Sequence, residues 1–326
     1  MPNRPPLLQI KNLTTSFHIN DNHVTAVRGV DLHINRAEIL AIVGESGCGK
    51  SVTALSILRL ISIPPGRIDS GQIKFKNQDL LDLSDRDMQK IRGNEISMIF
   101  QEPMTSLNPI FTIGDQIAEA IIQHQNITKL EARKQTLDLL QKVLMPSPEI
   151  RINQYPHELS GGMKQRVMIA MAIACRPALL IADEPTTALD VTIQAQILSL
   201  IASLRKDSEM SILLITHNLG IVAQFANRVA VMYSGKIVEE AHVDCLFENP
   251  MHPYTRGLLN SLPKDNSASK LEPIQGAVPH PAHLPQGCAF HPRCKDAMPC
   301  CQKQPQIKNV AKEKTHKVAC WLYEDK

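Results

Sequence analysis

The chain has 326 residues, of which 43% are apolar and 21% charged, and its basic residues outnumber its acidic ones by only 35 to 32. This composition is close to that of soluble globular proteins and argues against intrinsic disorder, and the absence of any basic run argues against nucleic-acid binding. The length suits one large domain with a modest appendage.

The N-terminus, MPNRPPLLQIKNL, has no apolar stretch of signal-peptide length. The most apolar stretch, residues 167–175, is far shorter than the roughly 18 residues that span a bilayer. We therefore expect a cytosolic chain that obtains any membrane span from a partner. In that compartment its cysteines would be reduced thiols or metal ligands.

Short apolar runs alternate with helix-like segments along most of the chain, as is typical of βαβ units around a buried sheet. Two early segments, 7–10 and 23–32, are instead expected to be antiparallel strands joined by a turn at Asp21 and Asn22. The predicted fold class is therefore α/β, with an antiparallel β subdomain. The strands predicted for the main sheet are 39–43, 96–100, 179–182, 212–215 and 229–232.

No comparable strand run occurs between Gln101 and Ser160, whereas residues 117–122 and 130–144 have helical spacing. We therefore predict an inserted helical subdomain over about residues 102–175. After about residue 262, repeated prolines interrupt any long element. The predicted organisation is a domain over residues 1–262 followed by an irregular cysteine-rich tail over residues 263–326.

The first chemical motif follows the strand at 39–43. Its sequence, GESGCGKS, fits the pattern G-x-x-x-x-G-K-[ST] between a strand and a helical pattern. Backbone N–H groups of such a loop converge on the β-phosphate, the lysine bridges the β- and γ-phosphates, and the serine hydroxyl binds Mg²⁺. We therefore predict an ATP and Mg²⁺ site formed by Gly44, Glu45, Ser46, Gly47, Cys48, Gly49, Lys50 and Ser51.

A second apolar strand, LLIADE, ends in two acids. Asp183 is expected to support the Mg²⁺ ion, and Glu184 to polarise the attacking water as a general base. An acidic pair at a strand end can also be a helix cap or a solvated edge. Its occurrence in the same chain as a complete P-loop favours the catalytic interpretation.

A further anion-binding helix start is expected in LSGGMKQR, where Ser160, Gly161 and Gly162 precede an apolar helical stretch. This segment lacks the lysine and the Mg²⁺ ligand that would hold a nucleotide by itself. We therefore predict that it completes the ATP site of another subunit.

The segment LSGGMKQR resembles the signature motif of the ABC ATPases. The order of the other segments around it also resembles the order in that family. The resemblance covers roughly residues 7–260 and implies a P-loop NTPase core. It also implies roles for Phe17 (stacking on adenine), Gln101 (sensing Mg²⁺ and the γ-phosphate), Asp190 (D-loop) and His217 (holding the γ-phosphate), each of which alone would more often be structural. Ala37 stands where the family usually has glycine, so we expect a local adjustment of that turn without loss of activity.

Four cysteines stand in a proline-rich segment too short to build much core, and a metal or cluster would supply the missing stability. The alternative is unligated cysteines in a loose tail. Their spacings are longer than the C-x2–4-C pairs usual for zinc. The tail, with GCAFHPRCKDAMPCC and HKVACWLY, is similar to the C-terminal extension of dipeptide and oligopeptide importer ATPases, which implies a [4Fe-4S] cluster. The implied ligands are Cys288, Cys294, Cys301 and Cys320, with the adjacent Cys300 left open as an alternative to Cys301.

The same resemblance implies a complete importer with a related second ATPase subunit, two transmembrane permeases and an extracytoplasmic solute-binding protein. The chain would lie peripherally on the cytoplasmic face of the bacterial inner membrane. Substrate contacts would lie in the partners, so nickel remains an alternative to peptides. A soluble ABC ATPase of translation or DNA repair, or a redox sensor built on the tail cluster, are alternatives of other classes.

Overall fold

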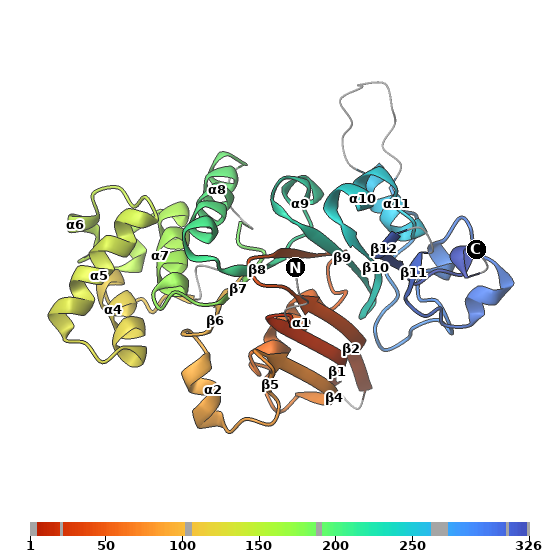
Figure 1. Ribbon diagram of the computed structural model, residues 1–326, viewed down its shortest axis with the longest axis horizontal. Helices are drawn as coiled ribbons and strands as arrows, with labels where there is room; N and C mark the ends of the chain where they lie inside the picture. Colours follow the sequence, from red (N-terminus) through yellow and green to blue (C-terminus); the bar gives the residue numbers. More distant parts are fainter. Residues whose placement is uncertain are drawn as a thin grey trace. The chain divides into compact units, whose positions relative to one another are not determined.

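The computed structural model describes residues 5–19, 22–101, 106–186, 191–261, 273–310 and 313–324. The chain divides into two compact units, one formed by Met1–Leu81 with Thr216–Lys326 and the other by Asp82–Ile215 (Figure 1). Within the described ranges, no helix combines the length and the apolar character needed to cross a bilayer.

An antiparallel sheet opens the first unit. Its strand order is β2-β1-β4-β5, where β1 is Leu8–Ile19, β2 Asn22–Ile34, β4 Gly66–Phe75 and β5 Gln78–Asp79. The antiparallel pairing of β1 with β2 confirms the predicted pair of strands, which are longer than expected. Apolar residues of β1, including Leu8, Ile10 and Leu13, are buried and form the inner face of this sheet.

The P-loop strand of the first unit is β3 (Ile39–Val43), whose five residues are all buried. It pairs in parallel with β9 (Arg228–Tyr233), and β9 pairs antiparallel with β10 (Lys236–His242). The helices of this unit are α1 (Lys50–Ile57), α9 (Leu219–Phe225), α10 (Val243–Glu248) and α11 (Pro253–Asn260). Helix α1 ends at Ile57, because Arg59 is left-handed at φ 52° and Leu60 N–H donates to Leu55 O.

The C-terminal tail is less irregular than the prolines predicted. Strand β12 (Glu313–Val318) pairs antiparallel with β10, and β11 (Lys308–Val310) pairs antiparallel with β12. The last proline is Pro305, so the residues after it are free to form a hairpin. Upstream of the hairpin the tail contains two short 3₁₀ turns, His291–Arg293 and Pro299–Gln302, and after it a third, Trp321–Tyr323. The domain boundary predicted at residue 262 lies outside the described residues.

In the second unit, β6 (Ile96–Ile99), β7 (Leu179–Asp183) and β8 (Ser211–Ile215) form parallel pairs with β7 in the middle. Helices occupy the stretch where no strand was expected, and the one predicted at 130–144 begins at a capping box formed by Thr128 and Glu131. The helices are α2 (Asp85–Ile91), α4 (Ile113–His124), α5 (Lys129–Lys142), α6 (Pro148–Arg151), α7 (Gly161–Ile173) and α8 (Val191–Ser208).

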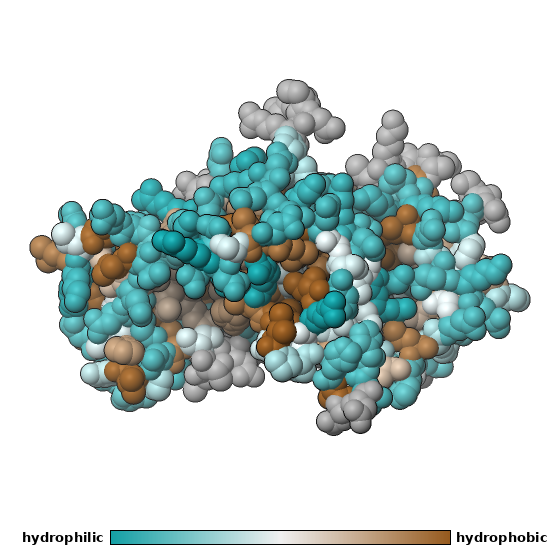
Figure 2. Space-filling model, turned by 90° about the horizontal axis from the view of Figure 1, so that it is seen from below, coloured by the Kyte–Doolittle hydropathy of each residue, from teal (hydrophilic) through white to brown (hydrophobic). Residues whose placement is uncertain are grey.

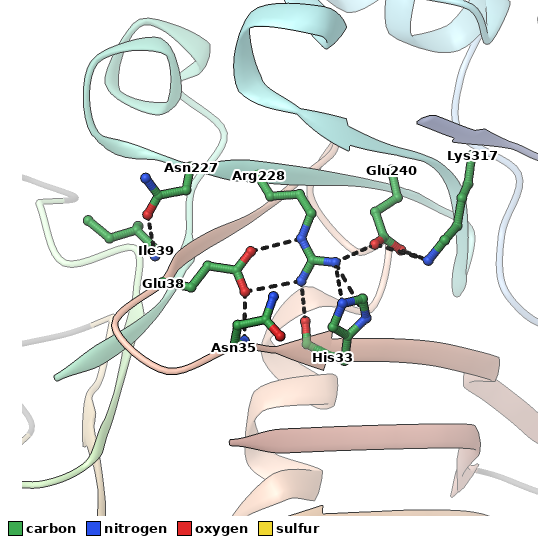
Figure 3. A network of polar contacts seen from close by, with 8 residues as sticks. All are labelled: His33, Asn35, Glu38, Ile39, Asn227, Arg228, Glu240 and Lys317. Carbon is green, nitrogen blue, oxygen red and sulfur yellow. Dashed lines mark hydrogen bonds and ion pairs between the residues drawn. The ribbon is translucent and has the colours of Figure 1, made fainter. Parts of the chain in front are cut away.

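A buried ion network stabilises the strands around the P-loop strand in the first unit (Figure 3). Arg228, at the start of β9, donates to Glu38 Oε1 at 2.9 Å and to Glu240 Oε1 at 2.7 Å. It also contacts the ring of His33 at 2.8 Å, while Lys317 of β12 reaches Glu240 at 3.2 Å. One guanidinium thus links residues from β2, the turn before β3, β9 and β10, and through Glu240 it connects to the tail. Ala37, in the turn before β3, is left-handed at φ 53°, a conformation that glycine adopts more readily than alanine.

Candidate active site

The P-loop lies between β3 and α1 of the first unit. Lys50 opens α1 and is 5% exposed, and its ammonium group donates to Gly44 O at 2.8 Å and to Glu45 O at 3.0 Å. The preceding Gly49 caps the helix without a side-chain hydrogen bond, and no acid occupies the first turn of α1. Ser51 follows in that turn. The start of the helix therefore directs its first N–H groups and the positive end of its dipole towards the loop, as a phosphate site requires.

Two glycines allow the loop to approach the neighbouring strands. A Cβ at Gly44 would lie 2.2 Å from Met232 O. A Cβ at Gly49, which has a φ of 104°, would lie 2.5 Å from Ala26 O. Larger residues at either position would push the loop away from β9 and β2, so the glycine pattern in the sequence reflects close packing as well as phosphate binding.

The remaining predicted residues of the first unit surround this loop in different ways. Cys48 is 1% exposed, and burial raises the pKa of its thiol, so it acts as a small packed group. Phe17 lies on β1, where its ring is close to Gly66 of β4. The hydroxyl of Thr15 on β1 lies 3.0 Å from that of Ser56 on α1, which fixes the strand of Phe17 to the P-loop helix.

His217 is exposed and lines a cavity together with Gly44 and Glu45 of the P-loop. The hydrogen bond from Thr216 N–H to Ile42 O, 3.3 Å long, holds the preceding residue beside the end of β3. His217, the residue predicted to hold the γ-phosphate, therefore lies next to the first residues of the loop.

The acidic pair lies in the second unit. Asp183 ends β7 and is 4% exposed. Glu184 follows in a left-handed conformation, φ 45°, and its N–H donates to Ile215 O at 2.9 Å. The side-chain amide of Gln101, which follows β6, donates to Glu184 Oε2 at 3.3 Å. Left-handed backbone in a non-glycine residue is uncommon and is concentrated at functional positions. The two residues predicted from separate motifs, Gln101 and Glu184, are thus in direct contact.

Ser160 caps α7, its hydroxyl accepting from Met163 N–H at 3.4 Å. Ser160 and Gly161 are exposed and Gly162 is half-buried, so the helix start predicted to serve another subunit is open to solvent in the single chain. Asp190 lies outside the described residues. The sequence analysis missed Gln165, which is 1% exposed and donates to Pro185 O at 2.6 Å. This bond links the signature helix to the residue after Glu184.

Four tail cysteines line a single cavity: Cys288, Cys294, Cys301 and Cys320. All are free thiols, and Cys300 is exposed and does not line that cavity. Burial raises the pKa of Cys288 and Cys294 and raises that of Cys320 to about 11. Among the residues that the structure describes, no three His, Cys, Asp or Glu side chains are arranged to hold a metal ion.

The P-loop also has partners that motif reasoning did not find. Tyr254 of α11 accepts a hydrogen bond from Glu45 N–H, and Arg293 of the tail forms an ion pair with the Glu45 carboxylate. Arg293 is separated from Glu45 by 248 positions. Nothing local in either segment predicts this pairing.

A P-loop on a buried parallel strand, an acidic pair at the end of another strand and a serine-glycine helix start together define an ATP-binding cassette. Residues 27–187 match the ABC transporter family, and residues 238–301 match the C-terminal region of oligopeptide/dipeptide transporters.

Relatives match almost the whole chain. The oligopeptide transport ATP-binding protein AppD of Bacillus subtilis is 54% identical over 98% of this chain and 97% of its own length, and the dipeptide transport ATP-binding protein DppD of the same species is 49% identical over 98% and 96%. The chain belongs to the family of ABC transporter ATP-binding proteins, in its oligopeptide/dipeptide group, and is an ATPase.

Solved structures support the same fold. The dimeric post-hydrolysis structure of the ATP-binding cassette MJ0796 with ADP and Pi is 28% identical, with a TM-score of 0.66 over 72% of this chain and 98% of that one. The cbiO1 protein of Clostridium perfringens, part of the ABC transporter complex cbiONQ, is 26% identical, with a TM-score of 0.64 over 76% and 92%. The predicted P-loop NTPase fold of the ABC ATPase type is therefore confirmed.

Proposed function

We propose that the chain is the ATP-hydrolysing subunit of an importer of dipeptides or oligopeptides. The observation that carries this proposal is the similarity over 98% of the chain, tail included, to proteins named for the transport of these substrates. A complete P-loop with a buried lysine provides the site for ATP, whose hydrolysis supplies the energy.

ATP is bound by the loop of the first unit. The N–H groups between Gly44 and Ser51 hold the phosphates, Lys50 leaves the loop carbonyls that it contacts in the free protein and bridges the β- and γ-phosphates, and Phe17 stacks on adenine. The hydroxyl of Ser51 and the carboxylate of Asp183 are the hard oxygen ligands that Mg²⁺ prefers. The ion neutralises charge on the phosphates during transfer.

Glu184 is the general base. Its carboxylate follows the strand that supplies Asp183, and its left-handed backbone re-aims it relative to that residue. The Gln101 amide donates to Oε2 of this carboxylate and so orients it, and in the proposed mechanism the carboxylate polarises the attacking water. His217, beside Gly44 and Glu45, is placed to contact the γ-phosphate.

A second ATPase subunit completes each site. The exposed start of α7 at Ser160 and Gly161 offers N–H groups to the γ-phosphate of a partner's ATP, and Asp190 would lie at the same interface. ATP thereby favours the closed pair and hydrolysis reopens it, a two-state element driven by the affinity of each state for the γ-phosphate.

The tail holds a [4Fe-4S] cluster in the cavity lined by Cys288, Cys294, Cys301 and Cys320. Four convergent free thiols are the donor set that such clusters use. Burial raises the pKa of Cys288, Cys294 and Cys320, so binding of a cluster by these thiols would release their protons.

The partners in the membrane are two permeases, supplied by an extracytoplasmic solute-binding protein, and the chain acts at the cytoplasmic face of the bacterial inner membrane. Several large apolar side chains of the second unit are exposed, among them Ile110 at 72% and Phe111 at 49%. Figure 2 shows hydrophobic patches on the surface of the helical part, at the left of the view. Exposed apolar groups of this kind offer a docking surface for a permease.

The experiment that tests the catalytic assignment is Glu184→Gln, which preserves shape and removes the base. We expect ATP binding close to wild type, turnover reduced by about 10²–10⁴-fold and accumulation of the closed pair. Wild-type turnover would remove Glu184 from this role. Import of labelled dipeptides by the reconstituted complex tests the transport assignment separately. A complex that hydrolyses ATP but does not import dipeptides would show that they are not its substrate.

A further inference from the structure

The tail segment between Cys288 and Cys294 reaches the P-loop directly. Arg293 from this segment forms a bidentate ion pair with Glu45, with Nη1–Oε2 at 2.7 Å and Nη2–Oε1 at 3.0 Å. Its Nε donates to Gln275 O at 3.0 Å. The Arg293 side chain is only 5% exposed, so protein acceptors have replaced most of its water. A bidentate pair with a buried guanidinium, here with a carboxylate whose side chain is 29% exposed, is stronger and more directional than an ion pair between two exposed side chains.

The main chain of Glu45 is fixed by two further contacts. Its N–H donates to Tyr254 Oη at 2.8 Å, and its carbonyl oxygen accepts from Lys50 Nζ at 3.0 Å. Side chain, N–H and C=O of one P-loop residue are therefore each held by a different partner. Because phosphate binding depends on where the loop N–H groups and Lys50 point, a displacement of Glu45 would disturb both.

The ion pair lies beside a cluster of three packed aromatic side chains. The ring centroid of Phe290, from the same tail segment, lies 5.3 Å from that of Tyr233 and 5.4 Å from that of Tyr254, and all three side chains are buried. The Arg293 guanidinium lies 5.9 Å from the centroid of Tyr233 and 6.0 Å from that of Phe290. Phe290 also lines the cavity of the four cysteines. The contact thus runs without interruption from the cysteine cavity to the P-loop.

We propose that Arg293 is a positioning residue for ATP binding, which holds Glu45, and with it the P-loop, in the phosphate-binding conformation. Nucleotide affinity and the arrangement of the cysteine segment are then coupled, and the coupling acts in both directions. The inference rests on the nucleotide site proposed above and assigns to the tail a direct part in it.

A double-mutant cycle tests this coupling. Affinity for a non-hydrolysable ATP analogue with Mg²⁺ is measured by calorimetry on the full-length chain, purified without oxygen, for Arg293→Gln, Glu45→Gln and the double variant. Each single variant should bind at least about fivefold more weakly, as expected of coupled sites, and the double variant should bind no more weakly than the weaker single one. Unchanged affinity in Arg293→Gln, or effects that multiply in the double variant, would overturn the proposal.

Two further variants separate positioning from general damage. Arg293→Lys should recover part of the affinity, because an ammonium group can still contact one carboxylate oxygen, and it serves as the test variant if Arg293→Gln does not fold. Lys308→Met removes the tail ion pair with Glu324, at 3.2 Å, and should leave affinity unchanged; an equal loss there would show that any disturbance of the tail has the same effect. If the wild-type chain does not bind the analogue, the proposed nucleotide site is refuted. If the wild-type chain and Arg293→Gln bind it equally well, only the role of Arg293 is refuted.

Discussion

Replacing Arg228 by methionine tests whether the buried ion network stabilises the first unit. The side chains of Arg228, Glu38 and Glu240 are 11%, 10% and 4% exposed. Loss of one partner of a buried pair costs about 3–5 kcal/mol, because it leaves a desolvated charge without compensation. Glu38 keeps a hydrogen bond from Asn35 N–H at 2.6 Å and Glu240 keeps Lys317. Arg228→Met should therefore lower the free energy of unfolding by an amount near the lower end of this range, about 3 kcal/mol.

Lys317→Met is the matched control, because it removes a cation from the same network at a position where the side chain is 32% exposed. Water screens that pair, so the cost should be at most about 1 kcal/mol. In a unit of roughly 190 residues, each kcal/mol lowers the Tm by about 2–4 °C, so Arg228→Met should lose roughly 6–12 °C and the control no more than about 4 °C. Thermal unfolding followed by circular dichroism measures both. Equal small losses in the two variants would refute the assignment of a buried charge cost.

Three further predictions concern other sites. Burial, and after it the charge of Arg228, lowers the pKa of His33 in the folded chain. The unfolded chain therefore takes up the proton first, and stability falls as the pH drops below about 6.5. Urea midpoints measured between pH 7 and 5 should show this fall, and His33→Asn should make the midpoint depend less on pH. Gln165→Leu removes the hydrogen bond to Pro185 O and should lower the free energy of unfolding in urea by about 1–3 kcal/mol. An unchanged urea midpoint would show that this bond does not contribute to stability. Cys301→Ser should lose bound iron in elemental analysis of anaerobically purified protein while Cys300→Ser retains it, and the reverse pattern would exchange their roles.

Much of the fold could be predicted because its main strands are continuous apolar runs. Strand β3 is an example, since ILAIV is bounded by turn residues and followed by a P-loop, and all five of its residues are buried. The role of Glu184 could be predicted from its own strand end, and that of Gln101 only through the resemblance of its segment to a known family, but neither predicted a contact between the two side chains. The structure then shows their hydrogen bond.

Strand β10 could not be predicted, and the reason is physical. Its sequence, KIVEEAH, places Glu239 and Glu240 in the middle, and acids there suggest a solvated edge. In the structure they are 0% and 3% exposed. Glu239 accepts from Met251 N–H at 2.7 Å and contacts His316 at 2.8 Å. These partners are distant in the sequence, so the pattern of a buried strand is visible only once the chain has folded.

The same reasoning applies to the C-terminal tail. Its prolines and short turns indicate an irregular segment, yet His316 and Lys317 of β12 satisfy the two buried acids of β10, and Arg293 satisfies Glu45 of the P-loop. Buried carboxylates require partners, since an isolated charge in the interior is costly. Glu45 and Glu240 therefore have cationic partners, Arg293 and Lys317, that the chain supplies only after residue 290. Arg293 thereby joins the cysteine segment to the P-loop, and we expect a change in one to affect the other through this ion pair.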